Sequence, residues 1–264
     1  MLKHILILPL LLSFFTIPFL KKKEVLPPGC VKIGENIYID QTEVKNVDYR
    51  EYLHWLKRKH GERSVEFQTM LPDTNLWVIF KAHKISYFRS GAYHYYPVVG
   101  VSYEQAVAYC KWRSDRVNEY FYLNENKLSF KVLDTLKIKN VPRIFEYRLP
   151  TRKEWEQVAK TDYDPKELKK IEKKKLETGQ FFDPNRTKRS DVKVVIAKCG
   201  AFPPNALNVY EIFGNVAEMI DEKGIAKGGS WKHPKEECTV DKDFTYDIPN
   251  NWLGFRCACD KLGL

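Results

Sequence analysis

The residues best suited to chemistry lie in a loop near the end of the chain. His233 and Cys238 follow the corner Gly228-Gly229-Ser230-Trp231. An imidazole and a thiolate are both ligands for copper and zinc, so this pair could hold either metal. A lone histidine beside Pro234, in a loop rich in lysine and glutamate, is more often an ordinary loop residue. Both interpretations stay open at this point.

The other histidines and cysteines do not have the spacing of a metal or redox motif. No two of the six cysteines are arranged as Cys-x-x-Cys, and no two histidines of the chain's middle share a helical face. The cysteines are Cys30, Cys110, Cys199, Cys238, Cys257 and Cys259, and the histidines are His54, His60, His83 and His94. Any metal at His233 and Cys238 would therefore need an unusual site.

Two features should position this loop. Gly228 and Gly229 are adjacent, which indicates a backbone that needs positive φ or a close approach by another part of the chain. The short apolar run at residues 253–257 is bounded by polar residues, so it predicts a buried strand.

Helices and a hairpin should supply the rest of the core. Tyr49, Tyr52, Leu53 and Leu56 follow Asn46 with helical spacing, and Gly61 ends this pattern. Two capping boxes, Ser102-x-x-Gln105 and Thr151-x-x-Glu154, predict two more helices, the first of which directs Cys110 into the core. Two alternating runs within residues 31–40 predict a β-hairpin.

Charge and composition narrow the class of protein. The chain has 264 residues and a formal net charge of +10, and much of the excess lies in the segment 166–189 and at Lys21-Lys22-Lys23. A charge run of this kind is usually a solvated surface, and no aromatic and basic recognition module accompanies it. We therefore expect no nucleic-acid partner.

The chain is organised as a leader followed by one domain. Residues 5–20 are mostly apolar and precede three lysines, so residues 1–24 predict a signal peptide or signal anchor. The domain then spans residues 27–262, with polar, lysine-rich insertions near 121–147 and 160–190. We expect an exported protein, periplasmic or associated with the cell envelope, whose contact with the membrane is made by its amino-terminal segment.

Seven motifs, in order along the chain, resemble the formylglycine-generating-enzyme family, also called the sulfatase-modifying-factor family. They start at Tyr96, Ala106, Arg148, Ala201, Phe213, Lys227 and Gly254, and read YPVVGVS, AVAYCKW, RLPTRKEWE, AFPPN, FGNVAE, KGGSW and GFRC. The resemblance implies an α+β fold similar to that of C-type lectins, with little regular secondary structure and long packed loops. It also implies a disulfide between Cys110 and Cys257.

Family enzymes oxidise a cysteine of a sulfatase peptide to formylglycine, using copper(I) held by two cysteines. On this chain the second copper cysteine corresponds to Cys238, but the first corresponds to His233. The linear pair of thiolates is therefore absent, and we expect no copper cofactor. The resemblance further implies a calcium site formed by Asn215, the Val216 carbonyl and Glu218, all hard oxygen donors.

These expectations favour a pseudoenzyme. The resemblance includes non-catalytic, envelope-anchored lipoproteins of bacterial gliding-motility and secretion machineries, and an exported chain without the copper pair fits that branch. We expect a structural or interaction component with partners among envelope proteins; the sequence does not indicate its oligomeric state. The alternative is a metal-dependent oxidoreductase of the formylglycine-generating type with an altered site at His233 and Cys238.

Overall fold

The computed structural model describes residues 25–76, 87–129, 141–163, 166, 169 and 196–263. Within these residues the helices are α1 (Asn46–His60), α2 (Val65–Gln68), α3 (Tyr103–Glu125) and α4 (Arg152–Ala159), with 3₁₀ turns at Gly91–Tyr93 and Lys235–Glu237. The strands are β1 (Cys30–Lys32), β2 (Ile37–Asp40), β3 (Phe145–Arg148), β4 (Ala217–Met219), β5 (Ile225–Lys227), β6 (Phe244–Thr245), β7 (Leu253–Gly254) and β8 (Ala258–Lys261). Short elements joined by long connections confirm the expected α+β class.

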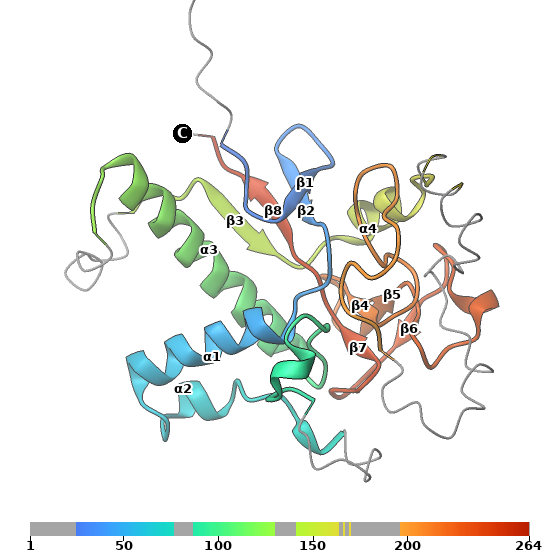
Figure 1. The fold of residues 1–264 in the computed structure, drawn as a ribbon, viewed down its shortest axis with the longest axis horizontal. Helices are drawn as coiled ribbons and strands as arrows, with labels where there is room; N and C mark the ends of the chain where they lie inside the picture. Colours follow the sequence, from blue (N-terminus) through green and yellow to red (C-terminus); the bar gives the residue numbers. More distant parts are fainter. Residues whose placement is uncertain are drawn as a thin grey trace, which may run out of the picture.

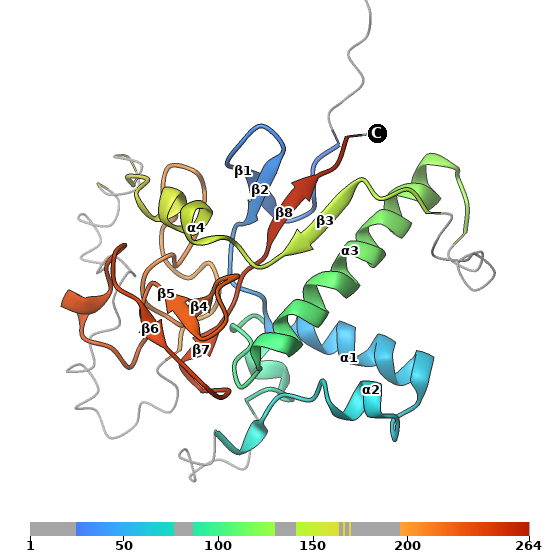
Figure 2. The same cartoon turned by 180° about the vertical axis from the view of Figure 1, so that it is seen from behind.

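The strands form two small sheets. One has the order β1-β2-β8-β3 and is antiparallel, and the other has the order β6-β5-β4-β7, in which β4 and β7 run parallel. Figure 1 shows α3 lying along β3 on one side of the molecule, with α4 and the second sheet on the other side. Figure 2 shows the same arrangement from behind, with α1 and α2 beside the start of α3.

The expected hairpin and helices are present. β1 and β2 pair as an antiparallel hairpin, and α1 ends at Gly61, whose φ is +91°. Both capping boxes are formed, because the Ser102 and Thr151 side chains each accept from the backbone N–H three residues ahead. The predicted insertion at 121–147 begins inside α3 and ends inside β3, while residues 130–140 and most of 160–190 lie outside the described residues.

The single strand predicted at residues 253–257 is wrong. The run is divided into β7 in one sheet and the approach to β8 in the other. The chain crosses between the sheets at Phe255 and Arg256, where the Arg256 guanidinium is buried and bonds to several partners instead of lining one strand face. An apolar run does not reveal such a crossing.

α3 covers the outer edge of β3. The Asn118 carboxamide donates to the Phe145 carbonyl (2.7 Å) and accepts from the N–H of Phe145 (3.0 Å), and the Ser114 hydroxyl accepts from the Tyr147 N–H (2.8 Å). These side chains satisfy groups that would otherwise form an open sheet edge.

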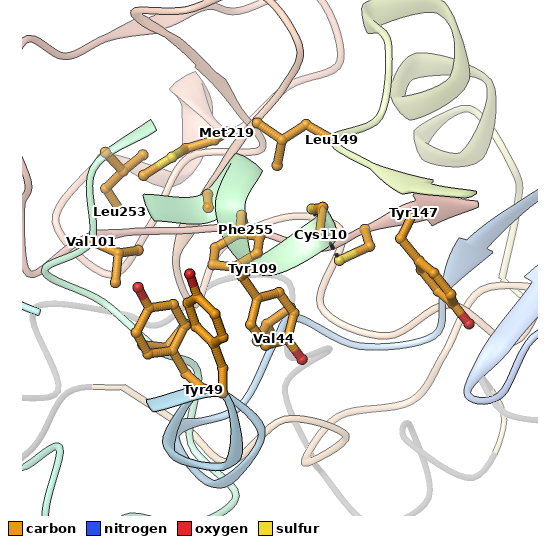
Figure 3. Packing of buried hydrophobic residues seen from close by; sticks show 14 of the residues in the cluster. Val44, Tyr49, Val101, Tyr109, Cys110, Tyr147, Leu149, Met219, Leu253 and Phe255 are labelled. Atoms are coloured by element: carbon orange, nitrogen blue, oxygen red, sulfur yellow. Dashed lines mark hydrogen bonds between the residues drawn. The ribbon is translucent and has the colours of Figure 1, made fainter. Parts of the chain in front are cut away.

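The main core lies where α1, α3 and the end of the chain meet. Figure 3 shows Tyr49, Tyr109 and Phe255 packed together there; the Tyr49 and Tyr109 rings stack at 5.7 Å, and Phe255 meets Tyr109 edge to face at 5.6 Å. Among the described residues, no helix combines the length and apolar character needed to cross a membrane.

Candidate functional site

Glycines are required at Gly228 and Gly229 because other parts of the chain approach the backbone closely there, as the sequence predicts. Both residues have positive φ, +83° and +70°. A Cβ at Gly228 would lie 2.6 Å from the Ile212 carbonyl oxygen, and a Cβ at Gly229 would lie 2.4 Å from the Cys238 sulfur. The corner therefore brings the backbone directly against Cys238.

Cys238 is buried behind this corner. The residue is only 5% exposed, and its thiol donates to the Pro234 carbonyl at 3.4 Å. Burial raises the pKa of the Cys238 thiol to about 11. Reactive and metal-binding cysteines need the thiolate form, so this environment opposes both roles.

His233 is held by neighbours other than Cys238. Its Nδ1 lies 2.8 Å from the Ser230 hydroxyl, and its ring packs on Phe244 at 4.1 Å and edge-on to Trp252 at 5.0 Å. Burial lowers the pKa of His233, so the neutral imidazole is favoured. These contacts make His233 a packed aromatic side chain.

Ser230 is the residue that both side chains share. Its hydroxyl bonds to His233, and a backbone hydrogen bond from Ser230 partly offsets the effect of burial on the pKa of Cys238. Within the described residues, no group of three or more His, Cys, Asp or Glu side chains could hold a metal ion. The raised pKa of Cys238 disfavours the thiolate that copper(I) needs, and one imidazole nitrogen of His233 is occupied by Ser230.

The other expected cysteine pair meets in the core. Cys110 on α3 and Cys257 before β8 are both buried, and their sulfur atoms lie 3.5 Å apart as thiols. Figure 3 shows Cys110 within the main cluster of buried side chains. The structure thus places in contact the two residues for which the resemblance implies a disulfide.

Glu218, which the resemblance assigns to a calcium site, is paired with Arg256 in this structure. Its carboxylate accepts from Arg256 through Nε (2.7 Å) and a terminal nitrogen (2.5 Å), and from the Trp155 indole N–H (2.8 Å). Both oxygens are thereby used in a buried ion pair. Arg256 bonds also to the carbonyls of Asp40, Gln41 and Tyr210, so it too is fully engaged.

Asn215 instead faces Glu43. Its amide nitrogen donates to Glu43 Oε1 at 2.8 Å, and its amide oxygen accepts from the Ala197 N–H at 2.9 Å. Glu43 is 1% exposed, and its second oxygen, Oε2, is buried without a hydrogen-bond partner. Glu43 therefore faces the amide nitrogen of Asn215, a hydrogen-bond donor, while the Asn215 oxygen is directed at the Ala197 N–H.

The surroundings of Glu43 carry excess negative charge. Burial and the neighbouring Glu211 carboxylate raise the pKa of Glu43 to about 8, and burial raises the pKa of Glu211 to about 7. Glu211 accepts from the N–H groups of Gly200 and Phe202. A nearby cation would favour the charged form of both carboxyls.

Sequence reasoning missed Glu43. Its partner Asn215 is 172 residues away, so no local spacing links the two. Asn215 and Glu211 have positive φ values of +55° and +44°, which are uncommon for residues other than glycine. The sequence of this loop does not show which residues adopt them.

Comparison with known proteins places the chain in a family. The family described as "Sulfatase-modifying factor enzyme 1-like domain" matches residues 15–261. The chain is 26% identical over 190 residues to the "Inactive C-alpha-formylglycine-generating enzyme 2" of Bos taurus, a match that covers 62% of this chain and 50% of that protein. It is also 26% identical over 201 residues to the "Formylglycine-generating enzyme" of Mus musculus, covering 63% of this chain and 45% of that protein.

The chain spans about half the length of the curated relatives it matches. Among solved structures it is similar to PvdO from Pseudomonas aeruginosa, with a TM-score of 0.48 and 15% identity over 86% of this chain and 80% of that one. CarF has a TM-score of 0.48 and 14% identity over 89% of this chain and 96% of that one. With a family match over nearly its whole length, the chain belongs to the sulfatase-modifying factor enzyme 1-like family and has its fold.

Proposed function

We propose that this protein is a non-catalytic member of its family, acting as a structural or interaction component of the cell envelope. The observation that carries the proposal is the state of Cys238, a buried thiol packed on Gly229 whose pKa is raised to about 11. A copper(I) pair needs two thiolates that face each other. Here the second position is the His233 imidazole, which packs on Phe244 and Trp252.

The similarity to relatives is compatible with either state of the site. One matching relative is named as inactive and another as an enzyme, at the same identity of 26%. Whether this chain is catalytic therefore has to be judged from residues 230–238, and their chemistry favours loss of catalysis.

We infer export from the leader alone. The apolar residues 5–20 and Lys21-Lys22-Lys23 support a signal peptide or signal anchor, and with it an envelope location and partners among envelope proteins. Fusing residues 1–30 to a reporter that is active only outside the cytoplasm tests this directly. An inactive reporter would contradict the inference.

A structural calcium ion forms a second part of the proposal. Glu43 would hold it through its unpartnered Oε2, and Asn215 would turn its amide oxygen from the Ala197 N–H toward the ion. Glu218 would have no role, because its oxygens bond to Arg256 and Trp155. The ion would supply the positive charge that the unpartnered Glu43 oxygen lacks. Calcium should raise the thermal unfolding temperature of the wild-type protein and should leave that of Glu43→Gln unchanged, while an equal rise in both would place the ion elsewhere.

The catalytic question has a simple test. The purified protein, supplied with copper(I), oxygen and a reductant, is incubated with a cysteine-containing sulfatase-type peptide, and the peptide is analysed by mass spectrometry. We expect the cysteine to stay intact. Conversion to formylglycine, abolished in Cys238→Ala, would establish the alternative.

That alternative is an oxidoreductase that uses His233 and Cys238 with a metal. The observation that favours it is that Ser230 bonds to both side chains. It would require His233 to leave Ser230 and Cys238 to lose its proton. The same peptide assay, repeated with His233→Ala, distinguishes the two proposals.

A further inference from the structure

Two adjoining cavities lie on the surface at the start of α3, away from residues 230–238. One has a volume of about 390 Å³ and lies between α3 and β3, and the other has a volume of about 310 Å³ and lies against the segment that follows β6. Tyr103 lines both cavities. Its hydroxyl donates to the Asp221 carbonyl at 2.8 Å, so the ring is fixed as a divider between them.

Apolar side chains stand at the surface of both cavities. Val107 lines the first and is 43% exposed, and Ile248 lines the second and is 66% exposed. Large apolar residues that remain exposed at a concave surface mark interaction sites more often than scattered ones do. The surface thus combines two hollows with an apolar anchor point at each.

Four acidic and four basic side chains line these cavities, but ion pairs leave an acidic excess, although the chain as a whole is basic, with a formal charge of +10. Glu146, Asp221 and Asp247 form no ion pair with other described residues, and the same is true of Lys111. Arg143 is 3.6 Å from Asp115, and Lys223 pairs with Glu104. Arg148 is neutralised by Glu154 and Asp260. Three carboxylates therefore remain against one ammonium group.

We propose that this surface, the Tyr103 groove, binds an extended, basic peptide segment of a partner protein. In an extended chain, side chains two residues apart point the same way and lie roughly 7 Å apart. Such a segment can place one apolar side chain in each cavity while it crosses Tyr103. A Lys or Arg side chain would then meet Asp221 or Asp247 and could also lie over the Tyr103 ring.

The inference rests on the proposed function, because it names the class of partner for a non-catalytic interaction domain. The two can nevertheless fail separately. Peptide conversion and copper binding depend on residues 230–238, whereas binding at the Tyr103 groove depends on α3 and the 221–224 and 246–249 segments.

A phage-displayed library of linear peptides, selected on the purified domain, is the probe. We expect enriched peptides that carry Lys or Arg and two apolar residues two positions apart, and binding that weakens with salt. Val107→Ser and Ile248→Ser should each reduce affinity by roughly tenfold, as should Asp247→Lys. The matched controls are Val65→Ser, at a residue 72% exposed on α2, and Asp241→Lys, at an exposed position of another loop, and neither should change it.

Several results would overturn the proposal. They are the absence of any selected peptide, selection of acidic peptides, or equal binding by the wild type and the Ile248→Ser variant. Dimerisation of the wild type that Ile248→Ser abolishes would assign the groove to a second copy of the chain instead, and would also overturn it.

Discussion

The core cysteine pair, Cys110 and Cys257, and the loop pair, His233 and Cys238, differ in how they are held. Cys110 and Cys257 come from elements far apart in the sequence, α3 and the approach to β8, and their sulfur atoms meet at 3.5 Å. Cys238 and His233 are only five residues apart in one loop, yet Cys238 bonds to Pro234 and His233 bonds to Ser230. The core pair is thus held by contacts between distant parts of the chain, whereas residues 230–238 are held together by local contacts.

Oxidation of the core pair should produce the largest effect. A disulfide between Cys110 and Cys257 would close a loop long enough to stabilise the protein by about 4–5 kcal/mol in the loop-entropy model. Thiol counting by mass spectrometry, with unfolding measured in the presence and absence of reductant, tests it. Cys110→Ser should remove the difference. A bond from Cys257 to any other cysteine would contradict the pairing.

Removal of the Arg256 charge should cost nearly as much. Arg256→Met leaves the Glu218 carboxylate buried without its cation, which typically costs about 3–5 kcal/mol. Chemical denaturation should show this loss. Arg256→Met combined with Glu218→Gln should recover part of the stability, since the Glu218 charge is removed together with its partner. A loss below about 1 kcal/mol would show that the framework does not depend on this ion pair.

The corner should tolerate no side chain while Cys238 is behind it. Gly229→Ala places a Cβ 2.4 Å from the Cys238 sulfur at a φ of +70°, so we expect a loss of about 1–3 kcal/mol. Cys238→Ala in the same protein should restore part of it, because the clashing atom is gone. Additive effects of the two substitutions would place Cys238 away from the corner.

The smallest effect should come from His233. Its ring contacts with Phe244 and Trp252 contribute about 0.5–1.5 kcal/mol, so His233→Ala should lower stability by that amount. His233→Phe should retain most of it, because an aromatic ring still packs there. A variant His233→Phe as unstable as His233→Ala would assign the role to the Ser230 hydrogen bond instead.

Local signals predicted the elements, and ordered motifs predicted the family. The capping residues Ser102 and Thr151, the spacing of Tyr49 to Leu56 and the paired glycines at 228 and 229 each act within a few residues, so the sequence shows them directly. Periodicity could not show that the 253–257 run crosses between sheets, because that depends on where Arg256 finds its partners.

The candidate site was only partly predictable for the same reason. The resemblance to the family pointed to His233 and Cys238, but their partners Ser230 and Pro234 became known only from the fold. Glu43 could not be found, because Asn215 reaches it across 172 residues. The Tyr103 groove joins α3, β3 and two distant turns, which no sequence pattern connects.

The central claim is that residues 230–238 hold no copper, and anaerobic titration of the purified protein with copper(I), in competition with a chromophoric chelator, tests it most directly. We predict that the wild type and Cys238→Ala compete equally weakly. Tight binding of one copper(I) per chain that disappears in Cys238→Ala would contradict the account.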